Sequence, residues 1–140
     1  MRRGILMAAM VLTVLVSGTM VFGETNQQGE KDEGLAALME KNHKNLETAV
    51  QTAYLDGVEN QLQEQDYQKI DEAVRAIADV AQQAKQNYSQ GDAFDAIAGE
   101  LQEHAEKAGS AAAEQNHPEV NVEIGEMAEY CAACHQEFRW

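Results

Sequence analysis

Only one proline, Pro118, stands in this chain of 140 residues, and alanine, glutamine, glutamate and lysine dominate the sequence from Asp32 onward. Proline breaks helices, whereas these four residues favour them. Apolar residues recur at steps of three and four, which is the period of an amphipathic helix, and no alternating β-branched run of strand length is present. The pattern therefore predicts an all-α fold.

Four helices are expected, over residues 32–56, 66–88, 93–113 and from Pro118 onward. Asp32 and Asp66 are candidate N-caps, and Pro118 suits a first helical turn. The expected inward positions are Leu35, Leu38, Met39, Leu46, Ala49, Val50 and Ala53; Ile70, Ala73, Val74, Ile77, Ala81 and Ala84; Phe94, Ile97, Ala98, Leu101, Ala105 and Ala108; and Val120, Ile124, Met127, Ala128, Cys131 and Phe138. The short connections between the segments predict an antiparallel four-helix bundle.

Residues 1–23 have the pattern of a signal peptide. Met1-Arg2-Arg3 is basic, residues 4–23 carry no charge, and Ile5 to Val16 form an apolar centre. We expect export to the periplasm and cleavage after Gly23. An uncleaved membrane anchor is the alternative, because the uncharged stretch is nearly long enough to span a bilayer. Polar residues 24–31 are expected to be a disordered tether before a domain at 32–140.

The two cysteines of the chain lie in the run Cys131-Ala132-Ala133-Cys134-His135. C-x-x-C-H is the attachment signature of c-type haem. A spacing of three places both sulfurs on one side of a helix, where they form thioethers with the porphyrin vinyl groups. His135 then follows as an iron ligand. The sequence predicts one covalent haem c, wedged between helices whose interior positions are largely alanine, with the motif on the last helix.

Three other interpretations of the cysteine pair were weighed. A dithiol redox pair usually follows a strand in a βαβ unit, which is absent from the pattern. A zinc site needs about four ligands, and the remaining histidines, His43, His104 and His117, lack finger-like spacing. A disulfide closing so short a loop stabilises little. Export agrees with haem attachment, because C-x-x-C-H is loaded on the outer side of the bacterial membrane.

The chain is strongly acidic, with 10 basic and 24 acidic residues and a formal net charge of −14. A nucleic-acid partner is not expected, because phosphate contacts need a positive face. The charge suits redox partners with a basic docking face, or it serves only solubility. No general acid/base pair or substrate-pocket signature is present, so we do not expect an enzyme.

Residues 32–140 resemble the cytochrome c-prime family, the class II c-type cytochromes, in carrying C-x-x-C-H on the last of four helices. The most specific part is Cys131 to Arg139, where an aromatic residue and an arginine follow the histidine. Leu38-Met39-Glu40 also resembles the first helix of the four-helix periplasmic cytochrome b, where a methionine binds the iron. The resemblance implies a periplasmic electron-transfer cytochrome with His135 as proximal and Met39 as distal ligand.

Alternatives to Met39 remain open at the sixth coordination position of the iron. In five-coordinate relatives an apolar residue of the first helix covers the iron, here Leu35 or Leu38, and small gases such as nitric oxide bind there. Met39 is then core filler. His43, one turn beyond Met39, is a further candidate ligand. A haem-free helical redox or metal module is the most distant interpretation.

Arg139 and the oligomeric state also stay open. Arg139 falls on the same helical face as His135 and is assigned to the haem site, where it is expected to pair with a propionate or to shield the proximal pocket. Its alternative is to complement the helix dipole. Relatives often dimerise through their first two helices. The second helix here is polar on its outer face, so the homodimer is left undecided.

Overall fold

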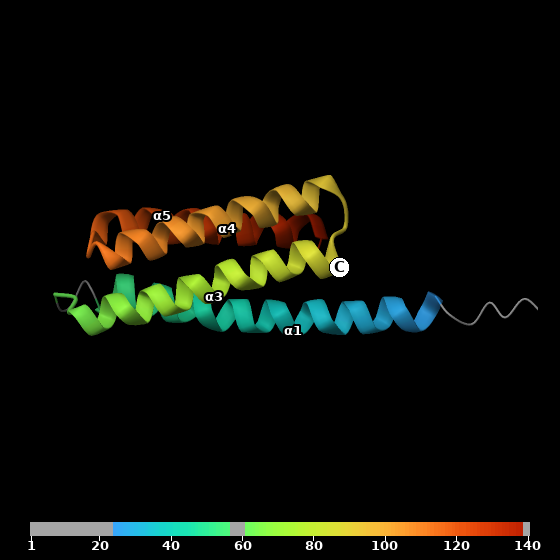
Figure 1. Ribbon diagram of the computed structural model, residues 1–140, viewed down its shortest axis with the longest axis horizontal. Coiled ribbons are helices and arrows are strands. Elements are labelled where there is room, and N and C mark those ends of the chain that lie inside the picture. Colours follow the sequence, from blue (N-terminus) through green and yellow to red (C-terminus); the bar gives the residue numbers. More distant parts are fainter. Residues whose placement is uncertain (1–23, 57–60, 139–140) are drawn as a thin grey trace, which may run out of the picture.

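The computed structural model describes residues 24–56 and 61–138, with the side chains of 33–54 and 61–138. The expected signal peptide, Arg139 and Trp140 lie outside this part of the chain. The described residues form α1 (Glu24–Val50), the π-helix η1 (Gln51–Asp56), α3 (Glu64–Tyr88), α4 (Asp92–Ala113) and α5 (His117–Phe138). No strand occurs among them. Helix α1 packs on α3, α3 on α4 and α4 on α5, which is the order of an up-and-down bundle (Figure 1).

The predicted boundaries of the last three helices agree with α3, α4 and α5 to within two residues. Helix α1 differs, because it begins at Glu24 rather than Asp32. The segment 24–31, for which a disordered tether was expected, is therefore helical. Its glutamine, glutamate and lysine residues are compatible with a helix, and no proline interrupts the run. Within the described residues no helix is long and apolar enough to cross a membrane.

The start of α3 corrects the assignment of Asp66 as the N-cap. Gln63 occupies the cap position, and Asp66 lies in the first turn, where its Oδ2 accepts a hydrogen bond from the Gln63 backbone N–H at 2.8 Å. Asp66, three residues after the cap, thus accepts the hydrogen bond of the Gln63 backbone N–H, as in a capping box. Pro118 is the second residue of α5, in its first turn as predicted.

The hydrophobic core joins α3, α4 and α5 to η1 and to the last residues of α1. All six predicted inward positions of α3 are buried. The large side chains with the least exposure are Ile70, Ile77, Ile124 and Met127. Ala128 was expected to face inward and is exposed. Helix α5 packs chiefly on α4 and only sparingly on α1, so its buried face is narrower than the predicted stripe.

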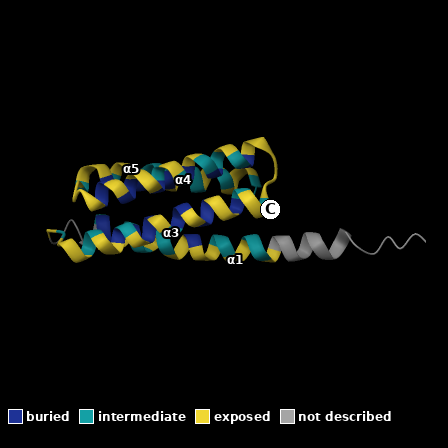
Figure 2. Ribbon diagram, viewed as in Figure 1, coloured by how far each residue is buried: buried dark blue, intermediate teal, exposed yellow. Residues whose placement is uncertain are grey.

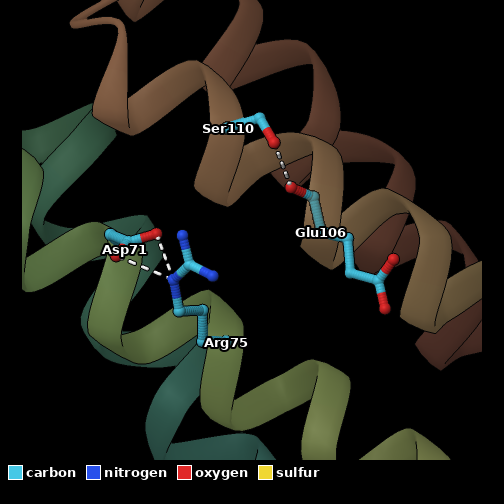
Figure 3. Close-up of polar contacts among 4 residues, drawn as sticks. All are labelled: Asp71, Arg75, Glu106 and Ser110. Carbon is cyan, nitrogen blue, oxygen red and sulfur yellow. Dashed lines mark hydrogen bonds and ion pairs between the residues drawn. The ribbon is translucent and has the colours of Figure 1, made fainter.

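Helices α3 and α4 approach closely at Gly109. A Cβ atom there would lie 2.9 Å from Asp71 Oδ1 on α3. Asp71 is held by Arg75, one turn along its own helix, with Nε–O distances of 2.7 and 2.8 Å. On α4, the Ser110 hydroxyl donates to the backbone oxygen of Glu106 at 3.0 Å (Figure 3). The polar groups beside this contact are thus bonded within their own helices.

Residues 33–41 of α1 are covered less than most other described parts of the bundle. Between residues 33 and 41 no residue is buried, and the apolar residues Leu35, Leu38 and Met39 keep intermediate exposure (Figure 2). Helix α5, which would complete the bundle on this side, makes few contacts with α1. The two helices that carry Met39 and the C-x-x-C-H motif are therefore neighbours with few contacts to each other.

Candidate functional site

A cavity of about 560 Å³ lies at the end of the bundle where α5 finishes. Cofactor and small-molecule sites usually have volumes of about 300–1,000 Å³. The cavity is bounded by α1, by the turn that leads into α4, and by the last turns of α5. Its lining residues are Leu35, Ala36, Met39, Glu40, His43, Gln90, Phe94, Cys134, His135 and Phe138.

The fold brings Met39 of α1 and His135 of α5 to the same cavity. On α1, Leu35, Met39 and His43 follow one another at four-residue steps, so they form one stripe along the cavity wall. On α5, Cys134 and His135 lie in the last turn and reach the cavity from the other helix. A thioether and an imidazole are both iron ligands in haem proteins.

Two aromatic rings form the apolar end of the cavity. Phe94, at the start of α4, is 2% exposed, and its ring meets that of Phe138 edge to face at a centroid distance of 5.3 Å. Gln90, in the turn before α4, adds a polar side chain beside them. Helix α4 can begin here because Gly91 adopts a φ of 112°, in the left-handed region that favours glycine.

The two thiols of the motif have different surroundings, and both are free. Cys134 lines the cavity, whereas Cys131 packs against the hydrophobic core. Burial raises the pKa of the Cys131 thiol to about 11 and also raises the pKa of Cys134. Only the thiolate is a strong nucleophile, so neither sulfur is activated by its surroundings. Thioether formation would need a catalyst outside this chain.

Asn42 links α1 to the motif. It is 5% exposed, and its Nδ2 donates a hydrogen bond to Cys131 Sγ at 3.9 Å. Its Oδ1 is buried without a hydrogen-bond partner among the described residues. A buried polar atom left unpaired costs about 1–3 kcal/mol. The inner face of α1 therefore carries an unsatisfied polar atom beside the motif.

The remaining histidines lie in three different places. His43 is exposed at the cavity rim. The His104 side chain is 14% exposed, and its Nδ1 lies 2.7 Å from Glu123 Oε2 of α5. His117 Nε2 lies 2.9 Å from the backbone oxygen of Ala53. In the part of the chain that the structure describes, no group of three or more His, Cys, Asp or Glu side chains is arranged to hold a metal ion.

Sequence reasoning missed three lining residues, Ala36, Glu40 and Gln90. Ala36 and Glu40 share a face of α1 with His43, at steps of four and three residues, so helical periodicity could have found them once Met39 was placed. Gln90 carries no such signal, because it reaches the cavity from a turn between helices. Arg139, the expected propionate partner, lies outside the described residues.

A scan against protein-family models, a search of curated proteins and a search of solved structures each found no match. The finding that stands is a four-helix all-α domain with a cavity between α1, α4 and α5.

Proposed function

We propose that this chain is a periplasmic c-type cytochrome that carries one covalent haem and transfers electrons. The observation that carries the proposal is that Met39 and His135 line one cavity, beside a cysteine of a C-x-x-C-H motif. Cys131 and Cys134 would hold the haem covalently, with His135 as proximal and Met39 as distal iron ligand. Two iron ligands on different helices would join α1 to α5.

The residues present fit such a group. The cavity has a suitable volume, and most of its exposed lining is apolar. The half-covered stripe of Leu35, Leu38 and Met39 offers the apolar surface that a porphyrin face would bury. Each square ångström of apolar surface removed from water contributes about 25 cal/mol. A haem bound in the cavity would cover this partly exposed face of α1.

The haem, when bound, supplies an iron that changes oxidation state by one electron. The chain's residues set the conditions for that change. A methionine sulfur favours the ferrous state and raises the reduction potential. Leu35, Phe94 and Phe138 would place apolar side chains around the haem, and an apolar surrounding tunes the reduction potential. A site filled on both sides needs little rearrangement on electron transfer, which suits a carrier rather than an enzyme.

The surface suits partners of opposite charge. With 24 acidic residues against 10 basic ones, the chain would be steered toward a basic docking face on a redox partner, and its association rate should fall as salt rises. Arg139 is proposed to pair with a haem propionate. Export through the segment 1–23 places the protein in the periplasm, where such haem attachment takes place.

A five-coordinate cytochrome that binds small gases is the second candidate. Leu35 lines the same cavity one turn before Met39, so either side chain can cover the distal face of the iron. If Leu35 does so, the sixth position stays free for a molecule such as nitric oxide. Electron transfer is preferred because Met39 offers a ligand atom at that cavity.

The spectrum of the haem-loaded protein tests the ligand set. Wild type should be low-spin and show the weak far-red band of methionine-ligated ferric haem, and Met39→Ala should become high-spin and bind carbon monoxide readily. Met127→Leu is the control, because Met127 is fully buried in the core and keeps its volume in this exchange. A high-spin wild type would favour the gas-binding candidate. An unchanged spectrum in Met39→Ala would remove Met39 as the ligand.

A further inference from the structure

Two hydrogen bonds join the start of α5 to η1, at the end of the bundle opposite the cavity. The Tyr54 hydroxyl donates to the backbone oxygen of Asn121. His117 Nε2 donates to the backbone oxygen of Ala53 at 2.9 Å, since a carbonyl oxygen can only accept. Ala53 lies in the last turn of η1, where backbone oxygens need a partner from outside the helix. These two bonds fix the position of η1 along α5.

A third hydrogen bond joins α1 to α5 nearer the cavity. Asn42 Nδ2 donates to Cys131 Sγ at 3.9 Å, and among the described residues it is the one side-chain bond between these two helices. It lies twelve residues from Tyr54 on one side and ten residues from Asn121 on the other. Residue numbers thus fall along α1 as they rise along α5 by a similar step. The two helices therefore run antiparallel in a single register.

The same register brings the two expected iron ligands to one level. Met39 precedes Asn42 by three residues, and His135 follows Cys131 by four. In antiparallel helices these steps lead in the same direction, over about 4.5 Å and about 6 Å at a rise of about 1.5 Å per residue. Met39 and His135 thus both lie about one turn beyond the Asn42–Cys131 bond, and they line the same cavity. A shift of α1 by one turn would separate them.

Packing alone does not account for an asparagine at this buried position. The Asn42 side chain is 5% exposed, and its Oδ1 has no hydrogen-bond partner among the described residues. An unpaired buried acceptor destabilises the folded chain, whereas a leucine of similar volume would not. The amide nitrogen is the part that reaches α5. Sulfur accepts hydrogen bonds both as a thiol and as a thioether, so the bond to Cys131 would persist after haem attachment.

We propose that Asn42 is a positioning residue that holds α1 and α5 in the register in which Met39 faces His135. The inference rests on the proposed function, since that function makes Met39 the distal ligand. Helix α1 also packs on α3, but apolar contacts are non-directional and allow a helix to slide or rotate. Hydrogen bonds are directional, so the bonds to α5 decide the register. When α1 shifts along α5 and Met39 is released, these bonds are lost.

The experiment compares haem-loaded full-chain variants by carbon monoxide affinity and by spectrum. Asn42→Leu removes the donor at similar volume, so the free energy of unfolding should not fall. Carbon monoxide must displace Met39, so its affinity should rise about fivefold when a bond that favours the Met39-bound register is lost. The far-red band of methionine-ligated ferric haem should weaken as well. Asn45→Leu is the matched control, because Asn45 is also a partly buried amide of α1 but has no bond to α5 among the described residues. It should keep the affinity of wild type.

A second variant keeps the test decisive if Asn42→Leu folds poorly. Tyr54→Phe removes one hydroxyl at the far end of the bundle, where it sets the same register. Carbon monoxide affinity should therefore rise in the same direction. Tyr67→Phe is its control, because Tyr67 also packs against the hydrophobic core but has no hydroxyl bond to α5 among the described residues.

An unchanged carbon monoxide affinity in Asn42→Leu would overturn the inference. An equal rise in Asn45→Leu would overturn it too, because the effect would then be one of general packing, and so would a high-spin haem-loaded wild type. A chain that acquires no haem fails the proposed function itself. The register is then tested in the haem-free chain, where alkylation of Cys131 should be faster in Asn42→Leu than in Asn45→Leu, and equal rates would show that Asn42 does not hold the two helices together.

Discussion

The two ends of the bundle are built from similar apolar stripes but are packed differently. At one end Ile70, Val120 and Ile124 are fully buried. At the other end Leu35 and Met39 keep intermediate exposure around a cavity of about 560 Å³. Alanine-rich helices close a core where they approach one another, and they leave a hollow where they do not. The open end is where the C-x-x-C-H motif lies.

The difference has a local cause in which helices touch. At the packed end small residues such as Ala105 and Gly109 let α3 and α4 come close, and branched side chains fill the remaining space. At the open end α1 and α5 meet only sparingly, and the contact that links them is the weak bond from Asn42 to Cys131. A bulky apolar ligand would fill the space between these helices, as isoleucine side chains fill it at the other end.

The largest effect is expected from truncating one side chain at each end. Ile70→Ala should lower the free energy of unfolding by about 2–5 kcal/mol, with or without haem, because it leaves a cavity in a packed core. Leu35→Ala should cost less than about 1 kcal/mol in the haem-free protein, since Leu35 is only half-buried, and about 2 kcal/mol once haem covers it. Urea unfolding of both variants in both forms measures this. If Leu35→Ala lowers the free energy of unfolding equally with and without haem, haem does not complete the core at the open end.

A smaller effect is expected from alkaline pH. Burial raises the pKa of Cys131 from an ordinary 9.0 to about 11, so above pH 9 the unfolded thiol loses its proton while the folded one keeps it. This contribution to stability is complete below pH 9, and about 2 kcal/mol of it is lost as pH rises from about 9 to about 11.

The matched variant for this prediction is Cys131→Ala. Subtracting its unfolding curves from those of the haem-free wild type isolates the thiol from lysine and tyrosine titrations. This alkaline loss of stability should also be absent from the haem-loaded wild type, where Cys131 would be a thioether without a titratable proton. Parallel pH profiles of haem-free wild type and Cys131→Ala would contradict the burial of this sulfur.

The smallest effect concerns the glycine beneath Tyr88 at the open end. A Cβ on Gly34 would collide with the Tyr88 hydroxyl, whereas one on Gly99 meets only Lys85 Nζ at 3.7 Å. Gly99→Ala should therefore stabilise by up to about 1 kcal/mol. Gly34→Ala should gain less, and Tyr88→Phe in the same chain should restore part of the difference. If thermal unfolding shows equal gains in stability for Gly34→Ala and Gly99→Ala, Tyr88 does not pack closely against Gly34 of α1.

The helices were predictable because their signals are local. Periodicity placed the buried face of α3 correctly at every position named, and Pro118 marked the start of α5. The extension of α1 to Glu24 was not predicted, because a polar segment has no apolar stripe that distinguishes helix from tether. Asp66 was assigned to the N-cap but lies at N3, because an acidic side chain at either position can accept a hydrogen bond from a free backbone N–H at the helix start.

The candidate site was predictable where it lies on helix faces and not elsewhere. The placement of Met39 on an inward stripe and of His135 after the cysteines led to two residues that do share a cavity. Gln90 could not be found, because turn residues follow no period. The pairing of His104 with Glu123 depends on how α4 and α5 align, which sequence spacing alone does not determine.

The central claim is that the open end of the bundle holds a covalently attached haem. The most direct test is the mass of the protein exported from cells with a haem-maturation system, measured after denaturation. Wild type should gain the mass of one haem, and a Cys131→Ala, Cys134→Ala double variant should gain none. A wild-type chain that keeps its unmodified mass under these conditions would show that no haem is attached.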